Sequence, residues 1–282
     1  MSTIIPTALT RETIITLGSK LAPAAVILGR LRSLTQRADT DLEEVVSLIR
    51  LDPALTFHVI RMSNSVLFGV RERNDSLEGA VGRVGFQNIY RLVGLSATQQ
   101  VCQRDLSVYG LKASRLWENA VATAAAAEVL AIPAGIDPGL AYAGGLLRTL
   151  GRAIIDAAAC EKIYPGEMEW PLVADWERVH FGITAPEVTA LLLSHWRFPA
   201  ELVDSVRAHH DPFAEPASNV GACVLNLACG VAARFWVDLP GESAHWHRSE
   251  AKLTLANVTQ AELDESTEKA WAHYTALCTS AQ

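Results

Sequence analysis

Apolar residues recur along almost the whole chain at intervals of three and four positions, the spacing that places them on one face of an α-helix. Alternating runs of β-branched residues bounded by turn residues, which are typical of strands, are hard to find. The pattern therefore predicts an all-α protein built from many short helices.

Several helix boundaries can be predicted from local signals. Thr40 and Glu43 can form a capping box, which predicts a helix start with a buried apolar stripe. The stripe consists of Leu42, Val45, Val46 and Ile49. The next helix is predicted to begin at Asp52-Pro53, because aspartate caps well and proline at the first position loses no needed hydrogen bond. Ser76 indicates a further N-cap, and Gly85 indicates a helix end.

The clearest internal turn lies around Pro133 to Gly139, between an alanine-rich helix near 116–130 and a helix near 140–158. These two helices are expected to pack as an antiparallel pair. Loops are predicted at 165–171 and 211–218.

We expect an N-terminal segment over residues 1–20 and one domain over 21–215. The domain comprises an N-terminal helical lobe of about 21–110 and a second helical lobe of about 111–215. A C-terminal helical extension over 216–282 either completes the fold or carries an interface.

Charge is distributed unevenly along the chain and changes the choice of partner. Residues 1–110 hold 12 Lys/Arg and 10 Asp/Glu, whereas residues 111–282 hold 12 Lys/Arg and 21 Asp/Glu. The acidic second half would repel a polyanion, so protein or small-molecule partners are expected and nucleic acid is not. Five cysteines without a C-x-x-C pair are typical of a reducing cytoplasm. No segment approaches the ~18 uninterrupted apolar residues of a membrane span, so no membrane partner is expected.

Several motifs in the same order together resemble the HDOD family of bacterial proteins. They are SLIRLDPALT at 47–56, RMSNSVLFG at 61–69, SLEGAVGRVG at 76–85, LW at 116–117, LSHWRFP at 193–199 and HHDP at 209–212. The resemblance implies an HD-like helical fold and gives a structural role to six motif residues. These are Asp52, Pro53, Asn64, Ser65, Gly69 and Gly85.

Relatives of this family are HD-type phosphohydrolases, in which histidines and aspartates on different helices bind metal ions that activate water. Aligned by eye, their first histidine falls at Asn119, and their His-Asp pair falls at Arg148-Thr149. Their later histidine falls at Ala185, their closing aspartate falls near Cys229, and only His209 and His210 remain. The resemblance therefore implies a degenerate site without catalytic residues, metal or cofactor. Arg148 brings a permanent charge that repels a metal and could bind a small anionic ligand.

Other candidate residues are interpreted structurally. His209-His210 is predicted to be a buried or rim pair in a helix-ending turn, and Arg148 to be surface-exposed or ion-paired. His245-Trp246-His247 is predicted to be a polar loop. Five tryptophans at helical apolar positions are predicted to anchor the core. They are Trp117, Trp176, Trp196, Trp236 and Trp271.

The resemblance implies a cytoplasmic, non-enzymatic signalling module that contacts proteins of two-component or cyclic-dinucleotide pathways. Two alternatives stay open. One is a residual metal-dependent phosphohydrolase that uses His209 and His210. The other is a DNA-binding regulator, since the predicted helices Asp41–Ile49 and Pro53–Met62 superficially resemble a helix-turn-helix. The second of these helices offers only His58 and Arg61 as cations, fewer than phosphate positioning normally takes.

Overall fold

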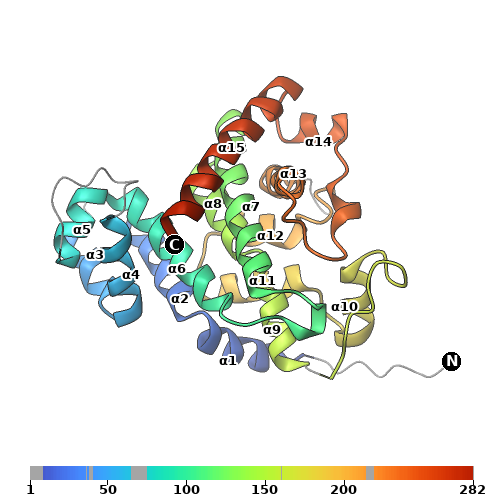
Figure 1. The fold of residues 1–282 in the computed structure, drawn as a ribbon, viewed down its shortest axis with the longest axis horizontal. Helices are drawn as coiled ribbons and strands as arrows, with labels where there is room; N and C mark the ends of the chain where they lie inside the picture. The colour runs from blue at the N-terminus through green and yellow to red at the C-terminus, as the bar shows by residue number, and fades with distance from the viewer. Residues whose placement is uncertain are drawn as a thin grey trace.

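The computed structural model describes residues 9–35, 37, 41–64, 75–159, 161–213 and 219–281. These residues form α-helices and short 3-10 helices with no strand among them, so the prediction of an all-α fold is confirmed. The N-terminal elements are α1 (Arg11–Leu21), α2 (Pro23–Thr35), α3 (Leu42–Ile49), α4 (Pro53–Ser63), α5 (Leu77–Val84) and α6 (Phe86–Val101). Helices α3, α4 and α5 gather at one end of the molecule, next to α2 and α6 (Figure 1).

The predicted starts and ends of these N-terminal helices are observed, except that the cap of α3 is shifted by one residue. Asp52 Oδ1 accepts from the Leu55 amide at 3.0 Å, and Ser76 Oγ accepts from the Gly79 amide at 3.1 Å. Gly85 ends α5 with a φ of 77°, a conformation that favours glycine. The cap of α3 is Asp41 and not Thr40, because the Asp41 carboxylate accepts from the Glu43 amide. Thr40 itself, like the motif residues Ser65 and Gly69, lies outside the described residues.

The remaining elements form the larger, helical part of the fold. They are η2 (Ser107–Tyr109), α7 (Ala113–Ala134), α8 (Pro138–Leu147), α9 (Leu150–Ala158), α10 (Val173–Phe181), α11 (Ala185–His195), α12 (Ala200–Ala208), α13 (Val220–Arg234), η3 (Ser243–Trp246), α14 (Glu250–Leu255) and α15 (Gln260–Ala281). Helices α7 and α8 form the predicted antiparallel pair. A Cβ on Gly145 would lie 2.4 Å from the Cα of Ala124, so this glycine sets their close approach.

The expectation of one helix near 140–158 is wrong, because the chain breaks between α8 and α9 at Arg148 and Thr149. The hydroxyl of Thr189 in α11 stabilises this break. It accepts from the Gly151 amide at 2.8 Å and lies 3.1 Å from the Arg148 carbonyl, to which it can donate. A side chain from another helix thus satisfies backbone groups that the interrupted helix leaves open.

One continuous apolar core extends from Ile14 in α1 to Ala270 in α15. Helix α13 packs against α7 and α12, and α15 lies along α7 (Figure 1). The segment after residue 215 therefore shares the core of the preceding helices. Among the tryptophans, Trp176 and Trp196 are buried as predicted, but Trp236 and Trp271 are 84% and 48% exposed. Trp236 follows the C-terminal turn of α13 with a positive φ, which carries it off the apolar face.

Within the described part of the chain, no single helix has the length and apolar character needed to cross a membrane. The bent pair Arg11–Leu21 and Pro23–Leu34, with 90° between its helices, meets that criterion only when the two are taken together.

Candidate functional site

The break between α8 and α9 places Arg148 inside the helical bundle with 2% of its surface exposed. Its Nη1 donates to Oε2 of Glu242 at 2.9 Å, and its Nη2 donates to Oδ1 of Asn119 at 2.5 Å. Asn119 belongs to α7, whereas Glu242 belongs to the segment between α13 and η3. The guanidinium group is therefore held from two directions by groups far apart in the sequence.

A second buried arginine shares the same carboxylate. Nη2 of Arg152 in α9 donates to Oε1 of Glu242 at 2.7 Å and to the carbonyl of Pro240 at 3.0 Å. Its guanidinium carbon also lies 5.0 Å from the ring centre of Tyr109, a cation–π distance. Glu242 thus bridges Arg148 and Arg152, with one oxygen for each.

The segment that carries Glu242 is fixed to the bundle by its backbone. Nδ2 of Asn119 donates to the Val237 carbonyl at 2.8 Å, and the Gly241 amide donates to Oε1 of Glu167 at 2.7 Å. Gly241 has a φ of 74°, and a Cβ there would lie 2.6 Å from the Cβ of Val173. Only glycine fits this turn, which delivers the next residue, Glu242, into the bundle.

Three histidines border the ion-pair network. His209 ends α12 and is buried, as predicted, and the ring centre of His210 lies 4.2 Å from that of His245 in a stacked arrangement. His210 Nε2 lies 3.9 Å from Oε1 of Glu242. His245 and Trp246 belong to η3, so the prediction of a plain polar loop is wrong, and Trp246 lies 5.7 Å beneath the Arg148 guanidinium.

The electrostatics of the cluster favour a charged carboxylate and neutral imidazoles. Burial alone would raise the pKa of Glu242, but the guanidinium groups of Arg148 and Arg152 outweigh it and hold that pKa below its ordinary value. Burial, reinforced by Arg148, lowers the pKa of His209 to about 3. Burial also lowers the pKa of His210, with the neighbouring histidines acting in the same direction.

The residues of the predicted degenerate site differ in whether they contact the network of Arg148, Arg152 and Glu242. They are Asn119, Arg148, Thr149, His209, His210 and Cys229. Asn119 contacts Arg148, and His210 approaches Glu242 while its ring lies 4.4 Å from that of His209. Cys229 is buried, and burial raises its pKa to about 12, so its thiol is protonated beside the Arg148 charge. Thr149 is buried next to Arg148 in the chain.

The donor set does not fit a metal ion. A guanidinium group stays protonated in proteins and cannot ligate a cation. Arg148 and Arg152 also pair with both oxygens of the Glu242 carboxylate. No group of three or more His, Cys, Asp or Glu side chains among the described residues is arranged to hold a metal. Arg148 is ion-paired with Glu242, one of the two states predicted for it, and it is buried.

Sequence reasoning missed Glu242, Arg152 and a second buried acid, Glu177. The Glu177 carboxylate accepts from the Tyr109 hydroxyl at 2.8 Å and from the Ala185 amide at 2.7 Å. Burial raises its pKa to about 7 despite these donors. The turn Pro240-Gly241 was the only local signal near Glu242, and it does not reveal which buried partner the acid meets.

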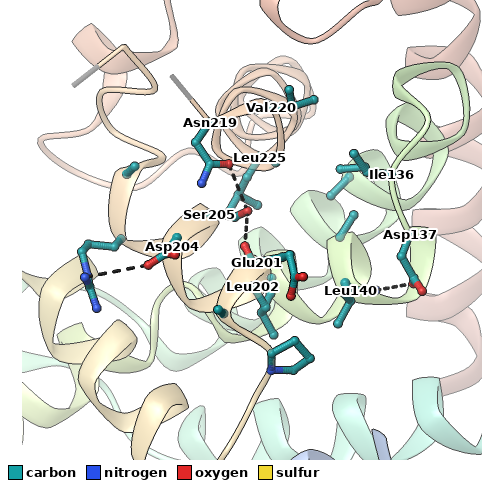
Figure 2. Close-up of a pocket in the computed structure, with 18 of the residues that line it drawn as sticks. Ile136, Asp137, Leu140, Glu201, Leu202, Asp204, Ser205, Asn219, Val220 and Leu225 are labelled. Atoms are coloured by element: carbon teal, nitrogen blue, oxygen red, sulfur yellow. Dashed lines mark hydrogen bonds and ion pairs between the residues drawn. The ribbon is translucent and has the colours of Figure 1, made fainter. Parts of the chain in front are cut away.

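A cleft of about 1050 Å³ lies apart from this network, between α8, α12 and α13. Leu140, Leu202 and Leu225 contribute apolar surface to it, and the carboxylates of Glu201 and Asp204 stand beside it (Figure 2). Its remaining acid, Asp137, pairs with Arg32 of α2. Asp204 pairs with Arg207 at 3.8 Å, so Glu201 is the acid in the described lining that forms no ion pair. The described lining residues include no nucleophile with an adjacent base.

Comparison with known proteins identifies this architecture. Residues 21–212 match the model of the HDOD domain. The fold resembles a provisionally named signal transduction protein from Marinobacter aquaeolei VT8, with a TM-score of 0.69, 21% identity and coverage of 92% of this chain and 59% of that chain. It also resembles a provisionally named phosphohydrolase from Shewanella amazonensis SB2B, with a TM-score of 0.63, 23% identity and coverage of 93% and 95%.

An HDOD domain protein of unknown function from Geobacter sulfurreducens has a TM-score of 0.62 at 20% identity, over 94% of this chain and 98% of that one. An uncharacterized protein of Treponema pallidum (strain Nichols) is 28% identical over 184 residues. That match covers 62% of this chain and 35% of the relative, so the chain spans about a third of the length of the curated relative it matches. At the identities of the solved structures, the likeness establishes the shared fold.

Proposed function

The chain belongs to the HDOD domain family, and from this premise we propose that it is a non-enzymatic signal-transduction module of the bacterial cytoplasm. We propose further that it acts through contacts with signalling proteins. The observation that carries the proposal is the buried network in which Glu242 bridges Arg148 and Arg152. Two residues that hydrogen-bond within it, Asn119 and Arg148, are positions at which the resemblance expects metal ligands in HD-type phosphohydrolases.

The network opposes metal-dependent hydrolysis on physical grounds. A catalytic metal needs several neutral imidazoles or carboxylates at ligand distance and an open position for water. Here two permanent positive charges are buried within the cluster, and they would repel a divalent cation. The surviving histidines His209 and His210 lack a free carboxylate partner in the network.

The cleft between α8, α12 and α13 supports a protein contact. Its apolar floor and the Glu201 carboxylate complement an amphipathic segment that carries a basic residue. A cytoplasmic location is supported by the four described cysteines, which are all free.

The decisive experiment combines metal analysis with a hydrolysis assay on the purified chain. We expect substoichiometric iron, manganese and zinc, and no Mn²⁺-dependent hydrolysis of bis(p-nitrophenyl) phosphate above the rate without enzyme. Stoichiometric bound metal, with hydrolysis that His210→Ala abolishes and that a control at exposed His273 leaves unchanged, would overturn the proposal in favour of a residual phosphohydrolase.

The protein contact is tested by site-specific photo-crosslinking in cells from position Leu140 on the cleft floor. We expect one discrete crosslinked protein that is lost with Glu201→Lys and kept with Glu265→Lys, a charge reversal on exposed α15. No discrete product, or equal loss with both variants, contradicts a contact at this cleft. Salt-dependent binding of random duplex DNA would instead favour the DNA-binding alternative, in which α4 offers Arg61.

A further inference from the structure

A second cleft, of about 900 Å³, lies between the two lobes, away from the arginine–glutamate network. One wall is formed by α2 and α3 of the N-terminal lobe. The other consists of His195 at the end of α11 and of the turn that follows it, with Trp196 and Arg197. This turn belongs to the LSHWRFP motif of residues 193–199, for which the proposed function gives no role.

The charged groups of this cleft are predominantly positive. Arg30 of α2 and Arg197 face it from opposite lobes, and neither forms an ion pair with any acid that the structure describes. His195 adds an imidazole side chain to the lining. The one carboxylate in the lining, Glu44, lies 3.4 Å from Nη1 of Arg37 and is therefore compensated.

The turn holds Arg197 in a specific conformation. Arg197 has a φ of 62°, the left-handed region that non-glycine residues rarely adopt. The turn is closed on both sides, since the Phe198 amide donates to the Leu193 carbonyl at 3.0 Å and the Trp196 amide donates to the Leu192 carbonyl at 2.9 Å. The backbone of Arg197 is thereby held at the edge of the cleft, and its side chain is exposed.

Close packing between α2 and the turn brings together the backbone segments that carry the two arginines. A Cβ on Gly29 would lie 2.8 Å from the Trp196 carbonyl oxygen, so α2 contacts the turn directly at this position. Arg30 is the next residue along α2. Trp196 also lines the cleft, is 6% exposed, and has a buried indole Nε1–H without a hydrogen-bond partner.

The remaining wall is apolar. Leu51, which is 65% exposed, stands at the edge of the cleft, and Leu48, Leu34 and Val26 continue the surface inward. A large aliphatic side chain exposed beside two unpaired guanidinium groups matches a ligand with an anionic head and an apolar body.

We propose that this interlobe cleft binds a small organic anion, in which a phosphate or carboxylate group is attached to an apolar body. Arg30 and Arg197 bind the anionic group from the two lobes, because guanidinium groups offer paired donors that match both kinds of oxyanion. Leu51 and its neighbours cover the apolar body. The site stands whether or not the protein is an enzyme, since it shares no residue with the Glu242 network.

The test is isothermal titration of the full chain with 1-naphthyl phosphate and 1-naphthoate, with 1-naphthol as the neutral analogue. We expect saturable binding of at least one of the two anions and no saturable binding of the naphthol. Arg30→Gln and Arg197→Asn should each weaken the anion's affinity about tenfold, the loss of one charge-assisted hydrogen bond. Asparagine is chosen because it tolerates a positive φ. Arg234→Gln, at an exposed arginine of α13, is the matched control and should leave the affinity unchanged.

Three results would overturn the proposal: saturable binding of neither anion, equal binding of the naphthol, or an affinity that Arg234→Gln lowers as much as the cleft variants do. Thermal melting of each variant checks that the fold is intact. The amide and indole N–H spectrum adds a local readout, in which the Trp196 indole signal, assigned with Trp196→Phe, should shift on titration. None of these outcomes depends on metal binding or hydrolysis, so the cleft and the proposed function are tested separately.

Discussion

Glu242→Gln keeps the shape of the buried side chain and removes the one negative charge that Arg148 and Arg152 share. Breaking a buried ion pair by removing one partner costs about 3–5 kcal/mol, because the remaining charge stays buried without compensation. A protein of this kind has a free energy of unfolding of only about 5–15 kcal/mol. With an unfolding entropy of about 2.1 cal/mol/K per residue, a loss of about 4 kcal/mol lowers the Tm of the 282-residue chain by roughly 7 °C.

Urea unfolding followed by circular dichroism at 222 nm, together with thermal melting, measures this loss. The matched control is Glu265→Gln, whose carboxylate pairs with Lys269 at 2.6 Å but is 63% exposed, so the expected change is below about 1 kcal/mol. The double variant Glu242→Gln with Arg148→Met should regain part of the loss, since one buried charge is then absent. If Glu242→Gln and Glu265→Gln unfold at the same urea concentration, the network does not carry the charge that we assign to it.

Three further outcomes can be measured on the same protein. Because the pKa of His209 is about 3 in the folded state and near 6.5 when unfolded, the unfolded state binds more protons below pH 6.5. The free energy of unfolding should then fall by up to about 1.4 kcal/mol per pH unit below 6.5, and urea titrations of His209→Asn should show a shallower fall. The pH dependence due to Glu177 runs in the opposite direction. Its pKa is about 7 in the folded state and 4.5 in the unfolded state, so its contribution to stability is complete below pH 4.5 and is lost as the pH rises through 7. Glu177→Gln should therefore gain stability relative to the wild type between pH 5 and 8, and an unchanged difference would contradict the assignment. Gly151→Ala should destabilise by about 1–3 kcal/mol, since its Cβ would lie 2.0 Å from the Ala185 carbonyl oxygen, whereas Gly82→Ala, with nothing within 4 Å, should be neutral or gain up to about 1 kcal/mol.

Helix boundaries were predictable where their cause is local. Asp52, Ser76 and Gly85 act through hydrogen bonds or backbone angles within a few residues, and the structure places all three as expected. The break at Arg148 was not predictable from its neighbours. It is stabilised by the hydroxyl of Thr189, 41 residues further along, and nothing near Arg148 reveals that partner.

The candidate site likewise has a part that could be predicted from the sequence and a part that could not. The resemblance put Arg148 and Asn119 in one predicted site, and the two side chains form a hydrogen bond in the structure. It did not reveal Glu242, which lies 94 residues after Arg148 and beyond the matched range 21–212. An exposed acid and a buried, paired acid look alike in one sequence, since burial is decided by the packing of distant elements.

The buried arginines and the C-terminal segment therefore depend on each other. Two guanidinium groups inside a bundle are costly unless an anion is buried with them, and among the described residues Glu242 provides that anion to both. The carboxylate reaches them because Gly241 permits the turn and because Asn119 and Arg152 bind the carbonyls of Val237 and Pro240. In this chain, the segment after residue 212 completes the electrostatics of the HDOD domain as well as its apolar core.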